Sequence, residues 1–168
     1  NGTATGTAST YSTGALTATS TVYCRVSSCG QTANTSTFTV TVYGNLTASL
    51  SGGSTNICYN TTPTTFTATG SGGNTPYTYL WYKNGTSTSV TTSTYSTGAL
   101  TASATVYCAV SSASSCGTAN TSTYSINVYP AIGTATLSGG STPICYNTTP
   151  ATFTATCTGG SGSYTYQW

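Results

Sequence analysis

The sequence predicts an all-β protein made of tandem β-sandwich repeats of about 85 residues, one complete and two partial. Three observations support this prediction. About two residues in five are Thr or Ser, and Thr, Tyr and Val favour strands. Short alternating runs are separated by Gly, Asn and Pro, which form turns. Long segments also return almost unchanged along the chain.

The internal repeat is the strongest of these signals. TYSTGALTATSTVYC at 10–24 returns as TYSTGALTASATVYC at 94–108. SGGSTNICYNTTPTTFTAT at 51–69 returns as SGGSTPICYNTTPATFTAT at 138–156. A period of about 85 residues is the length of one small domain, so each period is expected to fold as one unit.

The two periods are permuted along the chain, because Asn1 corresponds to Asn84 and Trp168 corresponds to Trp81. We therefore expect three parts, namely the C-terminal half of a repeat at 1–45, a complete repeat at 46–130, and the N-terminal half of a repeat at 131–168.

Two explanations fit the permutation. The chain is either a window from a longer repetitive polypeptide, or a subunit whose C-terminal half repeat is completed by the next subunit through strand complementation. Both predict a head-to-tail contact, which gives an open filament unless the rotation closes a ring. The predicted assembly residues are Tyr164, Tyr166 and Trp168, which alternate with Thr165 and Gln167 as in a half-buried strand.

The first half of the complete repeat contains three predicted strands. Leu46–Leu50 is followed by the turn SGGS, and Thr65–Thr69 follows the turn NTTP. Tyr77–Lys83 alternates aromatic and other residues, and the Asn-Gly at 84–85 after it predicts a hairpin.

Polar strands and a final strand pair are predicted in the second half. Thr88–Thr92 and Ser93–Thr97 read as polar, edge-like strands before a turn at Gly98. Ala104–Val110 and Thr121–Tyr129 form the last pair, joined by a Ser-rich loop. About seven strands in one period is typical of a β-sandwich.

Period-two alternation predicts the inward-facing residues. Each such core is small, so additional covalent restraints are expected. In the complete repeat the expected core is Phe66, Ala68, Tyr77, Tyr79, Trp81, Leu100, Val106, Cys108, Val110, Tyr124, Ile126 and Val128, and in the last half repeat it includes Phe153 and Trp168.

The charge composition excludes several classes of function. The chain has no Asp, Glu or His, and its only charged side chains are Arg25 and Lys83. General acid–base catalysis and calcium or magnesium binding draw on the missing residue types, and nucleic-acid binding needs clustered cations. No run approaches the roughly 20 apolar residues of a membrane span. We expect neither enzymatic activity nor a metal, a cofactor or a nucleic-acid partner.

Seven cysteines indicate an oxidising, extracellular setting. In the complete repeat the simplest pairing is Cys58–Cys116 with Cys108 free, and Cys58–Cys108 is a rival, because connectivity cannot be derived from sequence. No His is present for a Cys–His nucleophile, and the spacings match no zinc ribbon. The remaining cysteines, also expected in disulfides, are Cys24, Cys29, Cys145 and Cys157.

N-x-[ST] sequons are candidate glycosylation sites. Sequons are frequent by chance in a Thr-rich chain, yet a protein with almost no charge needs another source of solubility and of strand-edge protection. Covalent glycans on Asn, Ser or Thr would supply both. The sequons begin at Asn1, Asn34, Asn45, Asn60, Asn84, Asn120 and Asn147.

The combined pattern resembles the immunoglobulin-like (PKD-like) repeats of large secreted surface proteins and adhesins of Bacteroidetes-type bacteria. The resemblance implies immunoglobulin-like sandwiches with extracellular, non-enzymatic, structural or adhesive roles. The chain departs from this family because it has no carboxylate side chains. This absence argues against metal ions that bridge neighbouring repeats and hold them rigidly. The residues that carry it are Cys58, Phe66, Thr67, Ala68, Tyr79, 81–85, 100–102, 105–108, Cys116, Val128 and Tyr129.

Cys157 resembles the second-strand cysteine of the immunoglobulin disulfide, which bridges to the penultimate strand over a Trp. Its counterpart in the complete repeat is Gly70. The resemblance implies that Cys157 pairs with Cys24 of a following copy, and Cys145 with that copy's Cys29.

The leading hypothesis from the sequence is a structural subunit of an extracellular, glycosylated fibre or stalk made of end-to-end repeats. The short linkers VYGN and VYPAIG would hold neighbouring repeats with little freedom. The alternative is an adhesin module that binds surface glycans through exposed Tyr side chains such as Tyr82, Tyr95 or Tyr146. The two differ in whether the purified protein polymerises or recognises a sugar.

Overall fold

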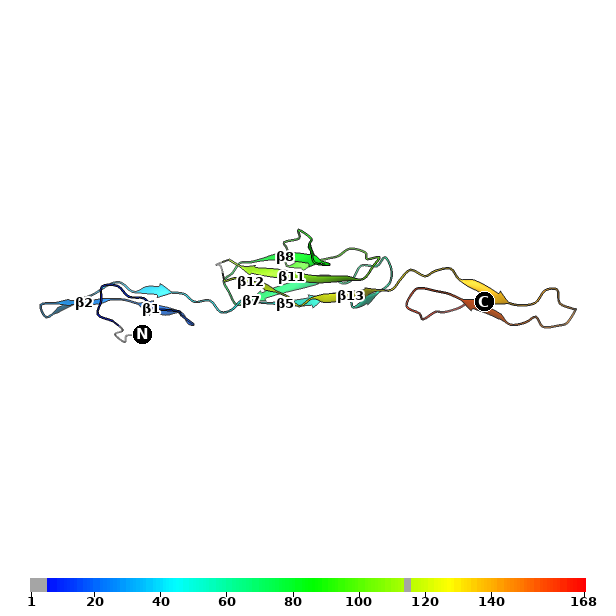
Figure 1. Cartoon of the computed structure of the whole chain (residues 1–168), viewed down its shortest axis with the longest axis horizontal. Coiled ribbons are helices and arrows are strands. Elements are labelled where there is room, and N and C mark those ends of the chain that lie inside the picture. Colours follow the sequence, from blue (N-terminus) through cyan, green and yellow to red (C-terminus); the bar gives the residue numbers. More distant parts are fainter. Residues whose placement is uncertain (1–5, 114–115) are drawn as a thin grey trace.

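The structure is a computed structural model that describes residues 6–113 and 116–168. Within these ranges all regular secondary structure is β-strand, and no helix is present. Figure 1 shows an elongated molecule with a central sandwich and a smaller strand-paired part on either side. The first part lies N-terminal to the sandwich and the last part C-terminal to it. The all-β prediction is confirmed.

The central sandwich consists of two sheets. The three-stranded sheet has the order β10 (Thr94–Tyr95), β7 (Phe66–Ser71) and β5 (Thr47–Gly52). The larger sheet has the order β6 (Asn56–Ile57), β13 (Tyr124–Val128), β11 (Ala104–Ser112), β8 (Tyr77–Lys83) and β9 (Thr86–Ser87), and β12 (Thr118–Asn120) also pairs with β11. This arrangement is an immunoglobulin-like β-sandwich.

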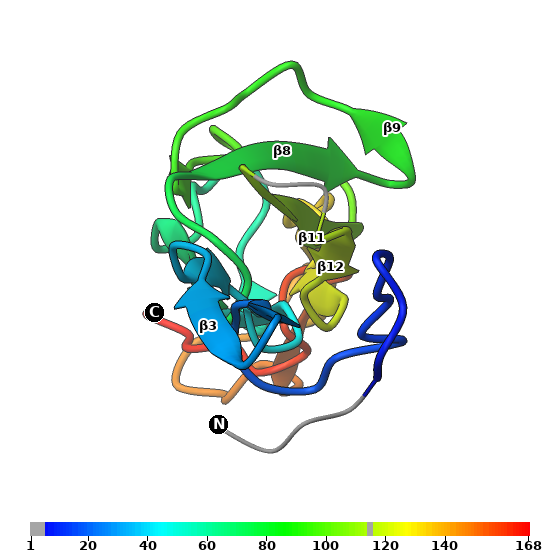
Figure 2. The same cartoon turned by 90° about the vertical axis from the view of Figure 1, so that its left-hand side faces the viewer.

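The hairpin of β8 and β9 forms at the Asn-Gly dipeptide. Asn84 and Gly85 both have positive φ, 51° and 77°, as a two-residue hairpin turn requires. The Asn84 side-chain oxygen also accepts a 2.8 Å hydrogen bond from the Thr105 backbone N–H. Figure 2 shows this hairpin at one edge of the sandwich.

The core of the sandwich surrounds Trp81, whose side chain is 0% exposed. Its ring lies 5.3 Å from the Tyr95 ring in a stacked arrangement and 6.4 Å from the Phe66 ring. The indole N–H donates a 2.8 Å hydrogen bond to the Thr92 carbonyl. The other buried hydrophobic residues are Ala68, Leu100, Ala104, Val106, Cys108, Val110, Ile126 and Val128.

The polar segment after the hairpin differs from the prediction. Thr88–Thr92 is not a strand, because the Thr88 N–H and hydroxyl both donate to the Trp81 carbonyl and the chain then turns through Ser89, whose φ is 61°. Tyr95 is also not an exposed edge residue: its side chain is 8% exposed and covers Trp81. The short strand β6, which pairs in parallel with β13, was not predicted.

The flanking parts contain paired strands without an opposing sheet. In the first part β1 (Ser20–Val22) pairs with β4 (Phe38–Val40), and β2 (Arg25–Ser28) pairs with β3 (Gln31–Asn34). In the last part β14 (Thr136–Gly139) pairs with β15 (Phe153–Thr156). Each pair has the register of its counterpart in the sandwich; Leu137 faces Ala155, for example, as Leu50 faces Ala68.

We predict that Ile126→Ala lowers the free energy of unfolding by about 2–5 kcal/mol, because Ile126 is 1% exposed and its removal leaves a cavity. Leu137→Ala is the matched control, since Leu137 is 62% exposed and its truncation should cost at most about 0.5 kcal/mol. Urea unfolding monitored by Trp fluorescence measures both. Equal losses for the two variants would contradict the assigned core.

Candidate functional site

Two exposed apolar surfaces flank the sandwich. The N-terminal face is formed by Tyr11, Leu16, Val22, Val26 and Phe38 of the first part, and the C-terminal face by Leu137, Ile144, Phe153, Tyr166 and Trp168 of the last part. Phe38 is 71% exposed and Trp168 is 78% exposed. Several large apolar side chains exposed in one part of a chain are typical of an interaction site.

The counterparts of these residues form the core of the sandwich. Phe153 is 47% exposed whereas its counterpart Phe66 is 0% exposed, and Trp168 contrasts in the same way with Trp81. The expectation that Phe153 and Trp168 are core residues is therefore not met within one chain. The reason is that the strands that cover Phe66 and Trp81 have no equivalent beside the last part.

Parts of both faces have the local structure of their counterparts in the sandwich, although residues 164–168 form no strand where the sandwich has β8. In the first part the Cys24 N–H donates to the Thr35 hydroxyl at 2.9 Å, as the Cys108 N–H donates to the Thr121 hydroxyl at 3.0 Å. In the last part a Cβ atom on Gly140 would lie 2.4 Å from the Phe153 ring, which matches the close approach of Gly53 to Phe66. The local chain thus holds each face without the opposing sheet.

The predicted assembly residues lie on the C-terminal face. Tyr164 is half-buried, donates a hydrogen bond from its hydroxyl to the Gly159 carbonyl, and packs edge-on against Tyr166 at 6.4 Å. Trp168 follows them and is mostly exposed. Sequence reasoning did not include Tyr11, Val26 or Phe38. Transfer of the predicted core positions Val110 and Tyr124 across the repeat would have found Val26 and Phe38. Tyr11 corresponds to Tyr95, which was expected to be exposed, so the sequence carried no signal for it.

The structure does not bring the expected disulfide partners together. All seven cysteines are free thiols. Cys58 lies beyond β6 near the start of β11, where the Asn60 N–H donates to the Leu100 carbonyl, whereas Cys116 lies beyond the end of β11. The nine residues of β11 separate the two ends by roughly 25 Å, which no disulfide can span. This corrects the Cys58–Cys116 pairing.

The rival Cys58–Cys108 pairing is also not formed. Cys108 is 0% exposed in the core, and Cys58 is exposed at the surface. Burial raises the pKa of the Cys108 thiol above its ordinary value of 9.0, and a backbone hydrogen bond at Leu80 partly offsets this increase. Cys108 therefore acts as a small apolar core residue.

The position of Cys157 can be read from its counterpart. A Cβ atom on Gly70 would meet Val110 at 3.0 Å and the Tyr77 ring at 3.1 Å. By the repeat correspondence, Cys157 would face the equivalents of these residues, Tyr164 and a Val26. Pairing of Cys157 with a Cys24, and of Cys145 with a Cys29, would involve a second copy, and both remain predictions.

The sequon asparagines lie at the surface. Asn34, Asn45, Asn60, Asn84, Asn120 and Asn147 are all exposed, and Asn1 lies outside the described residues. Asn60 and Asn147 occupy equivalent turns with the same φ of 59°. These positions are accessible to a modifying enzyme.

The tyrosines proposed for glycan binding differ in accessibility. Tyr146 is 100% exposed, Tyr82 is half-buried, and Tyr95 is buried in the core and cannot contact a ligand. Across the described ranges no three cysteines lie close enough to hold a metal ion. The same ranges contain no helix of the length and apolarity needed to cross a membrane.

No protein-family model and no curated protein matches the chain. Among the solved structures similar to it are three of immunoglobulin domains. The crystal structure of Down Syndrome Cell Adhesion Molecule (DSCAM) isoform 1.30.30, N-terminal eight Ig domains, aligns with 71% of this chain and 17% of its own at 15% identity and a TM-score of 0.46.

The other two are four-domain and isoform-specificity structures of the same kind. Dscam1 isoform 6.9, N-terminal four Ig domains, aligns with 64% of this chain at 15% identity and a TM-score of 0.45. The structure described as the structural basis for Dscam isoform specificity aligns with 64% at 17% identity and a TM-score of 0.43. The chain spans 26% and 27% of their lengths, respectively.

We predict that a maleimide reagent labels Cys24 in the reduced, dilute and unassembled folded chain and does not label Cys108. The two cysteines occupy equivalent positions in the repeat, but only Cys24 is exposed. Mass spectrometry after a short pulse, with and without urea, measures the labelling. Equal labelling of the two thiols without urea would show that the sandwich does not enclose Cys108.

The stability contributed by Cys108 should depend on pH. Because burial raises the folded-state pKa above 9.0, the contribution is complete below that value and is lost as the pH rises through the raised pKa. The difference in unfolding free energy between the native chain and Cys108→Ala should therefore shrink as the pH rises above 9.0.

Proposed function

We propose that this chain is a structural subunit of an extracellular, glycosylated fibre, in which the N-terminal face of one copy covers the C-terminal face of the next. The observation that carries the proposal is that the two faces are the two halves of the core seen intact in residues 46–130. Joining them would produce a second sandwich at each junction between copies. The fibre would then alternate sandwiches made by one chain with sandwiches made by two.

The register of the central sandwich defines the expected junction. Trp81 lies opposite Cys108 and Tyr79 opposite Val110 in the antiparallel pairing of β8 and β11. The same pairing in the junction places Trp168 opposite Cys24 of the second copy. Residues 164–168 and 24–28 would then form an antiparallel ladder between copies, which is strand addition to an open sheet edge.

Aromatic packing supports the same junction. In the sandwich Tyr95 stacks on Trp81 and Tyr124 packs edge-on against Phe66, with centroid distances of 5.3 Å in both pairs. By the repeat correspondence, Tyr11 of the second copy would stack on Trp168. Phe38 of that copy would pack on Phe153 in the same way as Tyr124 on Phe66. Full burial of each such aromatic side chain contributes about 1.5–3 kcal/mol.

The geometry of the contact favours an open polymer. The two faces lie on different parts of the chain on either side of the sandwich, so the contact is head-to-tail and repeats without closing unless the rotation forms a ring. The strand pairs of both flanking parts are preformed, so the ordering that association requires falls mainly on residues 164–168, which form no strand in the single chain. Exposed sequons and the abundance of cysteine support the extracellular, glycosylated setting.

We predict that Trp168→Ala abolishes polymer formation at concentrations where the native chain assembles. Loss of the buried indole should cost about 3–5 kcal/mol, which raises the dissociation constant by about two to four orders of magnitude. Sedimentation and negative-stain electron microscopy over a concentration series measure assembly. Tyr146→Ala is the control, because Tyr146 is 100% exposed and its counterpart Tyr59 is 45% exposed.

The proposal fails if the native chain stays monomeric at high concentration or if Trp168→Ala assembles as the native chain does. The mass of the native material under denaturing conditions tells which partner covers the C-terminal face. The mass of a single chain indicates a second copy, and a larger mass indicates a further stretch of the same polypeptide. A glycan array with a response lost in Tyr82→Ala, from a chain that does not polymerise, would favour the adhesin alternative.

A further inference from the structure

The outer face of the larger sheet carries an open hollow, lined by both apolar and hydroxyl side chains, that the two assembly faces leave unused. Leu80 and Tyr82 of β8 and Tyr107 and Ala109 of β11 are half-buried and alternate with core residues, so they point away from the core. The rings of Tyr82 and Tyr107 stack in parallel, with centroids 4.7 Å apart and an interplanar angle of 2°.

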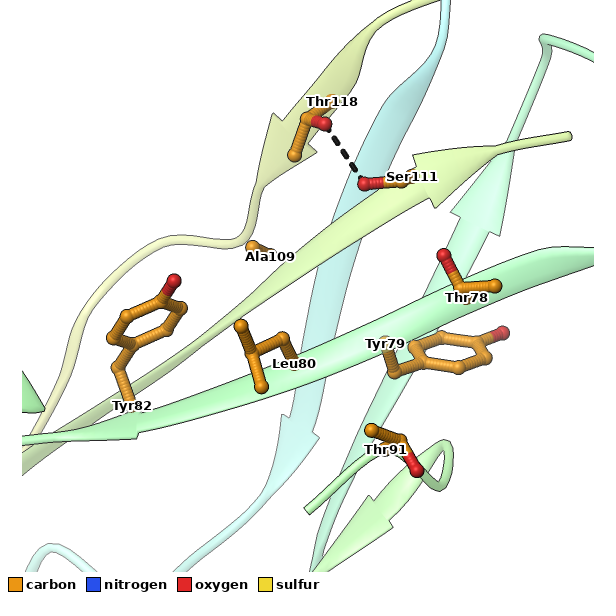
Figure 3. Close-up of a pocket in the computed structure, with 8 residues that line it drawn as sticks. All are labelled: Thr78, Tyr79, Leu80, Tyr82, Thr91, Ala109, Ser111 and Thr118. Carbon is orange, nitrogen blue, oxygen red and sulfur yellow. Dashed lines mark hydrogen bonds between the residues drawn. The ribbon is translucent and has the colours of Figure 1, made fainter. Parts of the chain in front are cut away.

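The hollow has a volume of about 450 Å³, which is within the range of small-ligand sites. Figure 3 shows Leu80 and Ala109 between Tyr82 on one side and the Ser111–Thr118 pair on the other. The hydroxyl groups of Ser111 and Thr118 lie 2.8 Å apart in a hydrogen bond. None of the residues that line the hollow carries a charge.

Asn120 lies beside this hollow. It is directly opposite Ala109 in the pairing of β12 with β11, and Ala109 is directly opposite Leu80 in the pairing of β11 with β8. Directly opposed residues of antiparallel strands point to the same face of a sheet. Asn120 is exposed and begins the sequon completed by Ser122.

We propose that Asn120 carries an N-linked glycan whose first sugars lie in this hollow, with an apolar pyranose face against the Tyr82 ring. The inference rests on the proposed function for its secreted, glycosylated setting, and it names one occupied sequon and the surface that its sugar covers. The glycan would shield the half-buried patch and the exposed edge of β12, both of which otherwise favour unwanted association.

A neutral sugar fits the chemistry of the hollow. A pyranose ring has an apolar face of C–H groups that packs on an aromatic ring, and its hydroxyl groups can bond to side chains such as Ser111 and Thr118. An ionic ligand would find no opposite charge there. Attachment at Asn120 would hold the sugar close to the hollow. A tethered group has a high effective concentration, so even a weak contact with the hollow would be occupied most of the time.

The attachment reaction needs a diphosphate-linked oligosaccharide donor and its transferase. The Asn120 carboxamide nitrogen forms a bond to the anomeric carbon of the donor sugar and loses one proton. The bond from that carbon to the diphosphate oxygen breaks, and its electron pair leaves with the diphosphate. No oxidant or reductant is involved.

The repeat supplies a matched comparison site at Asn34. Asn34 begins the equivalent sequon on β3, but the residue opposite it is the exposed Arg25 instead of Ala109. A cation therefore replaces the apolar floor beside Asn34. A sugar at Asn34 would extend into solvent, and its removal should leave the neighbouring Tyr23 unchanged.

Glycopeptide mass spectrometry of the native full-length protein, after chymotryptic digestion, tests occupancy. We expect a glycan at Asn120. The full chain secreted from a glycosylating host, with Asn120→Gln and Asn34→Gln variants, then tests the contact. Nitration of Tyr82 and Tyr107 by tetranitromethane should become faster in Asn120→Gln. Nitration of Tyr23 should stay at the native rate in Asn34→Gln.

An unmodified Asn120 in the native protein overturns the inference, and so does unchanged nitration of Tyr82 in Asn120→Gln when the native site is occupied. Asn120→Gln should still polymerise, whereas Trp168→Ala should keep the Asn120 glycan and fail to polymerise. Failure of the glycan inference and failure of the fibre proposal are therefore separate results.

Discussion

Burial of one tryptophan requires strands from both halves of a repeat, and the rest of the structure depends on this constraint. Trp81 pairs through its backbone with the strand of Cys108 and packs against Phe66 and Tyr95. Phe66 and Trp81 itself belong to the first half of the repeat, which corresponds to the last part of the chain. Tyr95 and Cys108 belong to the second half, which corresponds to the first part of the chain. Neither half alone can enclose the indole, so Trp168 lies at the surface of a single chain whereas Trp81 is fully enclosed.

The half repeats nevertheless keep their shape, because short-range hydrogen bonds hold them together in the absence of a core. Thr35 shows how: its hydroxyl accepts from the Cys24 N–H, and its own N–H donates to the Cys24 carbonyl at 2.8 Å. Thr121 repeats both contacts with Cys108 inside the sandwich. The abundance of Thr therefore has a structural role beyond strand propensity, since side-chain hydroxyls fix the bends that the apolar residues cannot.

The sequence predicts features set by local patterns and misses those set by topology. Strand β8 was expected over Tyr77–Lys83 and is found there, because alternation and the following Asn-Gly turn are local signals. The predicted Cys58–Cys116 disulfide is not formed, because the two cysteines lie in loops at opposite ends of the sandwich. Which end a loop occupies depends on the order of the strands, and local sequence patterns do not reveal that order. The position of Asn120 beside the hollow likewise needed the register. The division of the chain into 1–45, 46–130 and 131–168 stays a prediction.

The short parallel pairing of β6 with β13 joins the segment that follows the first strand of the sandwich to its last strand. The Asn127 N–H donates to the Thr55 carbonyl at 2.7 Å, and the Tyr129 N–H donates to the Ile57 carbonyl at 2.9 Å. Figure 1 shows the chain entering the sandwich at one end of its long axis and leaving at the other. Tension along that axis would slide these two strands past each other, so that their hydrogen bonds are loaded simultaneously and resist rupture together. These hydrogen bonds would therefore oppose extension of the unit along that axis.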